Sequence, residues 1–239
     1  MDYGLQLYSV RDVTESDLEG TLKKVAEIGY RYVEFAGFFG HSAEEVKAML
    51  DRYGLIVSGT HSGLGDLDAD FEGTVKYHKT IGNTNYIIPG ADLSTLDKII
   101  DFCAVMNKAQ LRLAEEGISL GYHNHSHEFV VMPWGSTIHS ELEKRGTFDF
   151  EIDTFWVFNA GIDPVETLKR LSGRVKVIHL KDGFKGGKGK SLGQGEAPVL
   201  KVREYAVKNN IRMVVESEGL DPTGLEEVKR CIDFLKAQE

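Results

Sequence analysis

The strongest constraint on the fold is a regular alternation, along the whole chain, of short apolar or β-branched runs with longer amphipathic runs. Strands that are buried on both faces read as continuous apolar runs, and a strand with its crossover helix needs about 30 residues. The apolar runs recur at about that interval. They predict eight strands, within residues 4–10, 32–37, 55–60, 85–90, 118–124, 148–153, 175–182 and 211–218.

Helix signals stand between these runs. Two segments each combine an N-cap serine, a glutamate three residues later and a closing glycine: Ser16, Glu19 and Gly29, then Ser42, Glu45 and Gly54. Further helices are expected within residues 93–117, 162–173, 197–210 and 222–238. Eight strand-helix units without a dividing linker predict one domain over residues 1–239, an α/β protein with a closed (β/α)8 barrel, the TIM barrel. An open, doubly wound sheet is the alternative.

Charge and composition narrow the class of partner. A formal net charge of −9 disfavours binding to nucleic acid, because the surface repels phosphates. There is neither a basic leader with an apolar stretch nor a run of 18 uncharged apolar residues, so we expect a cytoplasmic protein that does not bind membranes. Cys103 and Cys231 lie in apolar helical runs and are expected to be buried reduced thiols.

Polar residues gather where the predicted strands end, which is where a TIM barrel carries its active site. Side chains alternate along a strand, so two residues of one strand can share a face: His123 with His125, Glu151 with Asp153, His179 with Lys181, and Glu216 with Glu218. Convergence of imidazoles and carboxylates from strands five to eight predicts one divalent ion, with Mn²⁺, Co²⁺, Zn²⁺ and Mg²⁺ all compatible. Such an ion would polarise a carbonyl or hydroxyl oxygen.

Five stretches in this order, GYHNHSHEF, EIDTFW, VIHLKD, LGQGEAP and VVESEG, resemble the sugar phosphate isomerase/epimerase superfamily of xylose isomerase-like barrels. Its members include ketose 3-epimerases and inosose dehydratase, and endonuclease IV is a more distant relative. The resemblance implies a metal held by Glu, Asp, His and Glu from strands five to eight. Asp153, His179 and Glu216 match the last three ligands.

The first ligand differs. Where the epimerases have glutamate, this chain offers His123 or His125. We assign His123 to the metal and His125 to substrate binding or proton transfer. The resemblance also makes Glu216 a proton carrier, but the missing glutamate weakens a symmetric two-glutamate epimerisation.

Other residues receive roles with a structural alternative for each. Lys181 is a candidate base or enolate stabiliser, with a pKa lowered by the metal, or else a salt-bridge partner of Glu151. Four residues are candidates for substrate binding, with packing, capping or orientation of a histidine as the alternatives: His61, Glu34, Trp156 and Glu128. His127 is expected to be exposed. The glycine-rich segment 183–195 is either a lid, a phosphate contact or a solvated loop.

These features predict a metal-dependent isomerase or epimerase that removes a proton beside a carbonyl of a small sugar or polyol-ketone. The resemblance implies a homodimer or homotetramer. A dehydratase or lyase of a keto-sugar or inosose is the nearest alternative. An endonuclease IV-like enzyme is disfavoured by the negative net charge. A sugar-binding barrel without catalytic activity is a third possibility, and its ligand binding would not change in EDTA. Whether the substrate carries a phosphate stays open.

Overall fold

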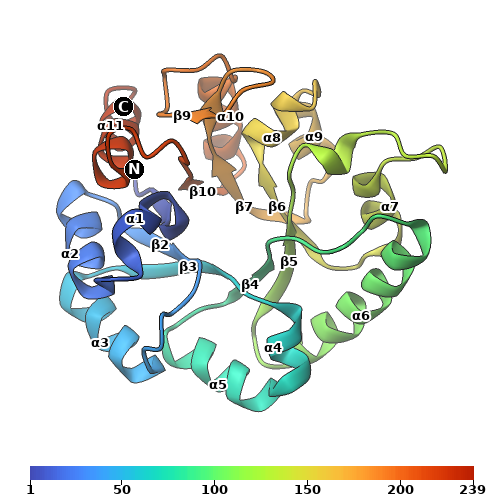
Figure 1. Cartoon of the computed structure of the whole chain (residues 1–239), viewed down its shortest axis with the longest axis horizontal. Coiled ribbons are helices and arrows are strands. Elements are labelled where there is room, and N and C mark those ends of the chain that lie inside the picture. Colours follow the sequence, from blue (N-terminus) through green and yellow to red (C-terminus); the bar gives the residue numbers. More distant parts are fainter.

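The eight predicted strands form one closed parallel barrel, in a computed structural model that describes all residues from Met1 to Glu239 (Figure 1). Neighbours around the barrel follow the order β1-β10-β7-β6-β5-β4-β3-β2. The TIM-barrel prediction is therefore confirmed, and the open-sheet alternative is wrong. The barrel strands are β1 (Gly4–Gln6), β2 (Tyr32–Phe35), β3 (Ile56–His61), β4 (Asn85–Ile88), β5 (Ser119–His123), β6 (Asp149–Asp153), β7 (Val175–Leu180) and β10 (Arg212–Val215).

Helices ring the barrel on its outside (Figure 1). They are α1 (Arg11–Thr14), α2 (Leu18–Ile28), α3 (Ala43–Tyr53), α4 (Leu64–Ala69), α5 (Phe71–Thr80), α6 (Leu96–Glu115), α7 (Ile138–Arg145), α8 (Thr154–Asn159), α9 (Pro164–Arg170), α10 (Val199–Lys208) and α11 (Gly224–Lys236). Two 3-10 turns occupy Leu7–Val10 and His127–Phe129. A short hairpin of β8 (Asp182–Gly183) and β9 (Gly189–Lys190) lies outside the barrel sheet.

The predicted helix ends are mostly correct. Ser42 and Glu45 form a capping box, and Gly54 ends α3 in the left-handed region. Ser16 is not an N-cap, however, because Asp17 accepts the Gly20 N–H instead. The predicted first strand is also too long, since the chain turns into the 3-10 segment after Gln6, whose side chain caps that turn.

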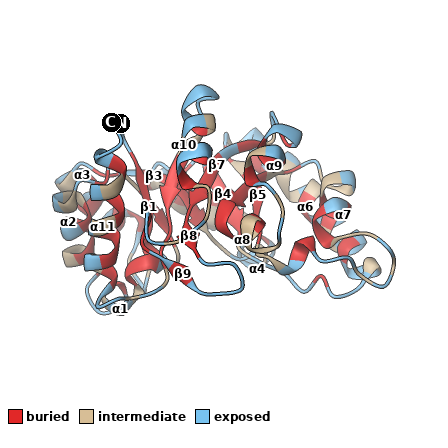
Figure 2. Ribbon diagram, turned by 90° about the horizontal axis from the view of Figure 1, so that it is seen from above, coloured by how far each residue is buried: buried red, intermediate tan, exposed pale blue.

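One apolar core fills the space between barrel and helices. Buried residues concentrate on the strands and on the inner helix faces, while the outer helix faces are exposed (Figure 2). Cys103 and Cys231 are both buried and unpaired, as predicted. None of the helices combines the length and the apolar character that a membrane span requires.

Strand register brings the polar residues together at one rim. Cα pairing sets His123 beside Glu151 on β5 and β6, and Asp153 beside His179 on β6 and β7. Because parallel strands all end on the same side, their last inward-facing residues share one cavity.

Candidate active site

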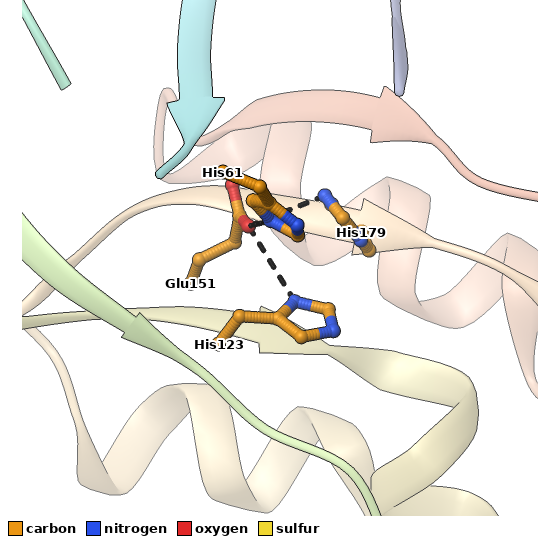
Figure 3. A group of neighbouring side chains, drawn as sticks. All are labelled: His61, His123, Glu151 and His179. Atoms are coloured by element: carbon orange, nitrogen blue, oxygen red, sulfur yellow. Dashed lines mark hydrogen bonds and ion pairs between the residues drawn. The ribbon is translucent and has the colours of Figure 1, made fainter. Parts of the chain in front are cut away.

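Two overlapping groups of side chains converge at this rim. His61, His123, Glu151 and His179 form a deep group, drawn in Figure 3, and His123, Asp153, His179 and Glu216 form an outer group. In each group the nitrogen and oxygen atoms that could bind a metal all lie within 4.8 Å of one another. The outer group is the ligand set predicted from the sequence, so those four residues do meet.

Glu151 organises the deep group. Its Oε2 lies 2.7 Å from His61 Nε2, 3.2 Å from His179 Nε2 and 3.4 Å from His123 Nδ1 (Figure 3). Burial and the neighbouring charge of Glu34 raise the pKa of Glu151 to about 7. His61 lines the cavity, as a substrate contact would, but its imidazole is committed to this carboxylate.

Glu34 lies beneath the histidines. It is fully buried, and its Oε1 accepts hydrogen bonds from Gln6 Nε2 at 2.6 Å and pairs with His179 Nε2 at 2.8 Å. Despite burial, the charges of His179 and His61 lower its pKa to about 2. The geometry fits the alternative role predicted for Glu34, orienting a histidine, and its contact with substrate stays a prediction.

His179 presents its two ring nitrogens to different carboxylates. Nε2 faces Glu34, while Nδ1 lies 3.3 Å from Glu216 Oε2. An imidazole whose Nε2–H is donated to a carboxylate has its Nδ1 lone pair free for a metal. The contact with Glu34 thus directs His179 toward the outer group.

The outer group fits a divalent ion. His123 Nδ1 and Asp153 Oδ2 are buried, yet neither has a hydrogen-bond partner in the protein. Buried polar atoms are normally satisfied, so two such atoms on the adjacent strands β5 and β6 fit a site that binds a ligand, and Glu34 Oε2 and Glu151 Oε1 beside them are also unsatisfied. Two imidazoles and two carboxylates are a suitable donor set for Mn²⁺, Co²⁺ or Zn²⁺. Burial lowers the pKa of His123, which keeps that imidazole neutral and able to bind a metal.

Lys181 lies next to the outer group and is fully buried. Its Nζ is 3.0 Å from Glu216 Oε2, 3.0 Å from Glu218 Oε2 and 3.6 Å from Asp153 Oδ2. Burial opposes the charge, but these carboxylates outweigh it and raise the pKa of Lys181. The expected salt bridge to Glu151 is wrong, because the carboxylates that Lys181 contacts belong to other residues. The expected lowering of the Lys181 pKa by a bound metal ion stays a prediction. The surroundings suit an ammonium that donates hydrogen bonds, the second of the two roles considered for this residue.

The predicted residues that follow the end of β5 have different environments. The strand stops at His123, so alternation no longer places His125, which is partly exposed and lines the cavity. Glu128 folds back and is fully buried, with Oε1 accepting from the Tyr122 hydroxyl and Oε2 from the His125 amide. Glu128 thus holds the loop, which fits the structural alternative for this residue, and its contact with substrate stays a prediction. His127 is exposed, as expected.

Trp156 fits its packing alternative. The Lys181 ammonium lies 4.5 Å from the centroid of its ring and covers one face, and stacking of a sugar on this residue stays a prediction. Conversely, Glu218 lines the cavity and binds Lys181, although no role was assigned to it from sequence. Its alternation with Glu216 was the available signal. Tyr8, Ala36 and Pro89 complete the lining and carried no signal.

The cavity at this rim has a volume of about 350 Å³, which suits a small polar ligand. A larger cavity, of about 610 Å³, lies at the opposite end of the barrel, lined by residues such as Met1, Ser58 and Arg212. In TIM barrels that end serves stability, so we place the site at the rim with the imidazoles and carboxylates.

Fold and site together define a (β/α)8 barrel with a polar cavity at the carboxyl ends of its strands. The family model for xylose isomerase-like TIM barrels matches residues 22–238, and the chain belongs to that family. No curated protein matches the chain significantly.

Solved structures agree with this family. A sugar phosphate isomerase/epimerase from Parabacteroides distasonis is similar over 99% of this chain and 93% of its own, with 24% identity and a TM-score of 0.86. A second such structure from the same organism has 26% identity, a TM-score of 0.84 and coverage of 98% and 97%. A probable 3-DHS dehydratase from Bacillus anthracis shares the fold at 10% identity, with a TM-score of 0.74 and 99% coverage of both chains.

Proposed function

We propose that the protein is a metal-dependent sugar isomerase or epimerase that removes a proton from the carbon beside a carbonyl group. The observation that carries the proposal is the outer group, in which two imidazoles and two carboxylates each bring a potential ligand atom within 4.8 Å of the others, and in which Asp153 Oδ2 is buried without a hydrogen-bond partner. The similarity to isomerase/epimerase structures supports the same class of reaction. A divalent ion bound by these four residues would polarise the substrate oxygen.

The protein's own side chains can move the proton. Glu216 is the proposed base, because it lines the cavity and its carboxylate is kept ionised: burial opposes this, but Lys181 and His179 lower its pKa. The electron pair of the broken C–H bond moves onto the carbonyl oxygen, where the Lys181 ammonium can donate to the enolate. His125, whose pKa is raised by its contact with Glu128, is the proposed acid that returns a proton.

A dehydratase is the second candidate. His123 stands at the strand-five position where the resemblance implies glutamate, so the chain lacks the second glutamate of a symmetric epimerisation. The same enolate could then expel a hydroxyl group from the next carbon, with His125 protonating the departing oxygen. The likeness to the probable dehydratase supports only the fold.

Solvent-deuterium exchange tests the proposal. The Mn²⁺-loaded protein is incubated in D2O with a panel of ketoses and inososes, and products are followed by NMR and mass spectrometry. We expect deuterium beside the carbonyl, with loss of water only for a dehydratase. Glu216→Gln should slow exchange by about 100-fold or more, while the exposed Glu204→Gln serves as a matched control. Full activity after metal removal, or in Glu216→Gln, would refute the proposal.

A further inference from the structure

The glycine-rich segment after β7 resembles, in position and composition, the loops with which many TIM barrels bind phosphate. Those sites follow strands seven and eight and use backbone N–H groups. The segment 183–195 follows the seventh barrel strand and contains six glycines and three lysines. Whether its amides are free to bind an anion can be decided from their hydrogen bonds.

Backbone N–H groups of this segment already bind a carboxylate of the protein itself, that of Asp182. Asp182 Oδ1 accepts from Gly183 N at 2.8 Å and from Ala197 N at 3.1 Å. Asp182 Oδ2 accepts from Gly193 N at 2.8 Å and from Gly195 N at 3.0 Å. The residue is almost completely buried. Converging backbone N–H groups of this kind form an anion-binding nest.

Glycine is needed for this arrangement. A Cβ on residue 195 would overlap Asp182 Oδ1, and Gly193 has a φ of +82°, in the left-handed region. The glycines that suggest a phosphate loop in the sequence therefore serve to let the chain close around an internal carboxylate.

The cavity wall offers an anion only imidazoles as cationic partners, and two of these already pair with carboxylates, His61 with Glu151 and His125 with Glu128. None of its eight lining residues is lysine or arginine, while Glu216 and Glu218 add carboxylates to the wall. The nearby ammonium of Lys181 is already shared among three carboxylates, and Gly189 of the hairpin packs over it, since a Cβ there would lie 3.4 Å from Lys181 Cε. A phosphate group in this cavity would lose its hydration and lie beside two carboxylates, with no lysine or arginine in the wall to compensate its charge.

We propose that the substrate is an uncharged polyhydroxy ketone and that Asp182 excludes phosphate esters by filling the nest of amides in the glycine-rich segment that follows β7. The inference rests on the proposed function for the reaction, and it adds the substrate class and a specificity residue. The proposed substrate therefore lacks the phosphate group that the names of the similar structures mention.

The first test compares paired substrates. Exchange in D2O is measured for free ketopentoses, ketohexoses and inososes and for the phosphate esters of the same ketoses, with the Mn²⁺-loaded protein. We expect exchange at least about 100-fold faster with the free compounds, the loss that follows when a charged group goes unpaired in a site. Equal or faster exchange with the esters overturns the inference. No exchange with either set refutes the proposed function, and the second test then decides the inference alone.

The second test uses inorganic phosphate and no substrate. Asp182→Ala should empty the nest, so phosphate should raise the melting temperature of this variant saturably, by about 5–10 °C, and leave that of the wild type unchanged. Asp163→Ala is the control, because Asp163 also accepts backbone N–H groups but caps the exposed start of α9. Chloride at equal ionic strength corrects for screening.

The outcomes of this second test are distinct. A saturable response of the wild type overturns the inference, because it reveals an anion site that Asp182 does not occupy. A folded Asp182→Ala protein without a response overturns it as well, because the amides would then not be an anion site. Should Asp182→Ala fail to fold even in phosphate, Asp182→Ser provides the same comparison, since its shorter side chain removes the carboxylate from the four N–H groups.

Discussion

Replacement of Lys181 by methionine tests the electrostatic description of the site most directly. The ammonium is fully buried and compensates the carboxylates of Glu216, Glu218 and Asp153. Methionine retains most of the volume and removes the charge, which leaves buried carboxylates unpaired. Removal of one partner of a buried ion pair costs about 3–5 kcal/mol. For a chain of this size, that lowers the melting temperature by about 6–20 °C.

Urea unfolding of Lys181→Met in EDTA measures this cost. Lys176→Met is the matched control, because Lys176 lies on β7, the strand that ends just before Lys181, but is exposed and pairs with Asp149 at 2.6 Å, an interaction of at most about 1 kcal/mol. We expect Mn²⁺ to restore part of the lost stability, since the ion supplies the positive charge that the variant lacks. A loss below about 1 kcal/mol at pH 7 would refute the reasoning, because the carboxylates would then be solvated.

The pH dependence gives a second readout for the same variant. In the wild type, burial opposes ionisation of Glu216, but Lys181 and His179 lower its pKa. A depressed carboxyl pKa contributes stability above the ordinary value, and this contribution is lost as pH falls. The difference between wild type and Lys181→Met should therefore be largest near pH 7 and shrink toward about pH 4, where the unfolded carboxyl group is protonated.

Three further outcomes follow from the structure. A divalent ion at a hundred times its Kd should raise the melting temperature by about 5–10 °C in calorimetry, and Asp153→Asn should abolish this shift. Burial lowers the pKa of His78 to about 4, so only the unfolded chain binds a proton at this residue between about pH 6.5 and 4. Over that range the free energy of unfolding of the wild type should fall by about 3 kcal/mol relative to that of His78→Gln. A difference in urea unfolding that does not change with pH would contradict this expectation. Gly59→Ala should weaken metal binding about 10-fold in a titration without unfolding the protein. The new Cβ would lie 2.9 Å from Glu34 Oε2 and displace the carboxylate that orients His179. Unchanged affinity would show that Glu34 does not hold His179 in place.

The barrel could be predicted because its signal is repeated. Eight apolar runs at a constant interval indicate a closed parallel sheet even when single boundaries are wrong, as at Gln6 and Ser16. The outer group could be predicted for a similar reason. His123, Asp153 and His179 lie within regular strands, where alternation and register determine direction.

Prediction failed where the chain leaves a strand or where partners come from distant elements. β5 ends at His123, so nothing in the local pattern indicates that Glu128 turns back toward Tyr122. The partners of Glu34 and Lys181 depend on which strands become neighbours when the barrel closes. Burial alone could not be converted into a pKa either, because Lys181 meets three carboxylates whose positions only the folded chain defines.

The side chains of the consecutive residues Lys181 and Asp182 point to opposite sides of the chain, and this restricts the register of the segment that contains them. Adjacent side chains of an extended chain point to opposite sides, so the ammonium enters the barrel while the carboxylate enters the ring of amides. A slip of one residue would exchange them. The carboxylate would then face Glu216 and Glu218, and the ammonium would face four N–H groups, so both contacts would repel. This pair of opposite charges therefore favours the native register of the chain after β7, because a shift by one residue would place each charge against groups of the same sign.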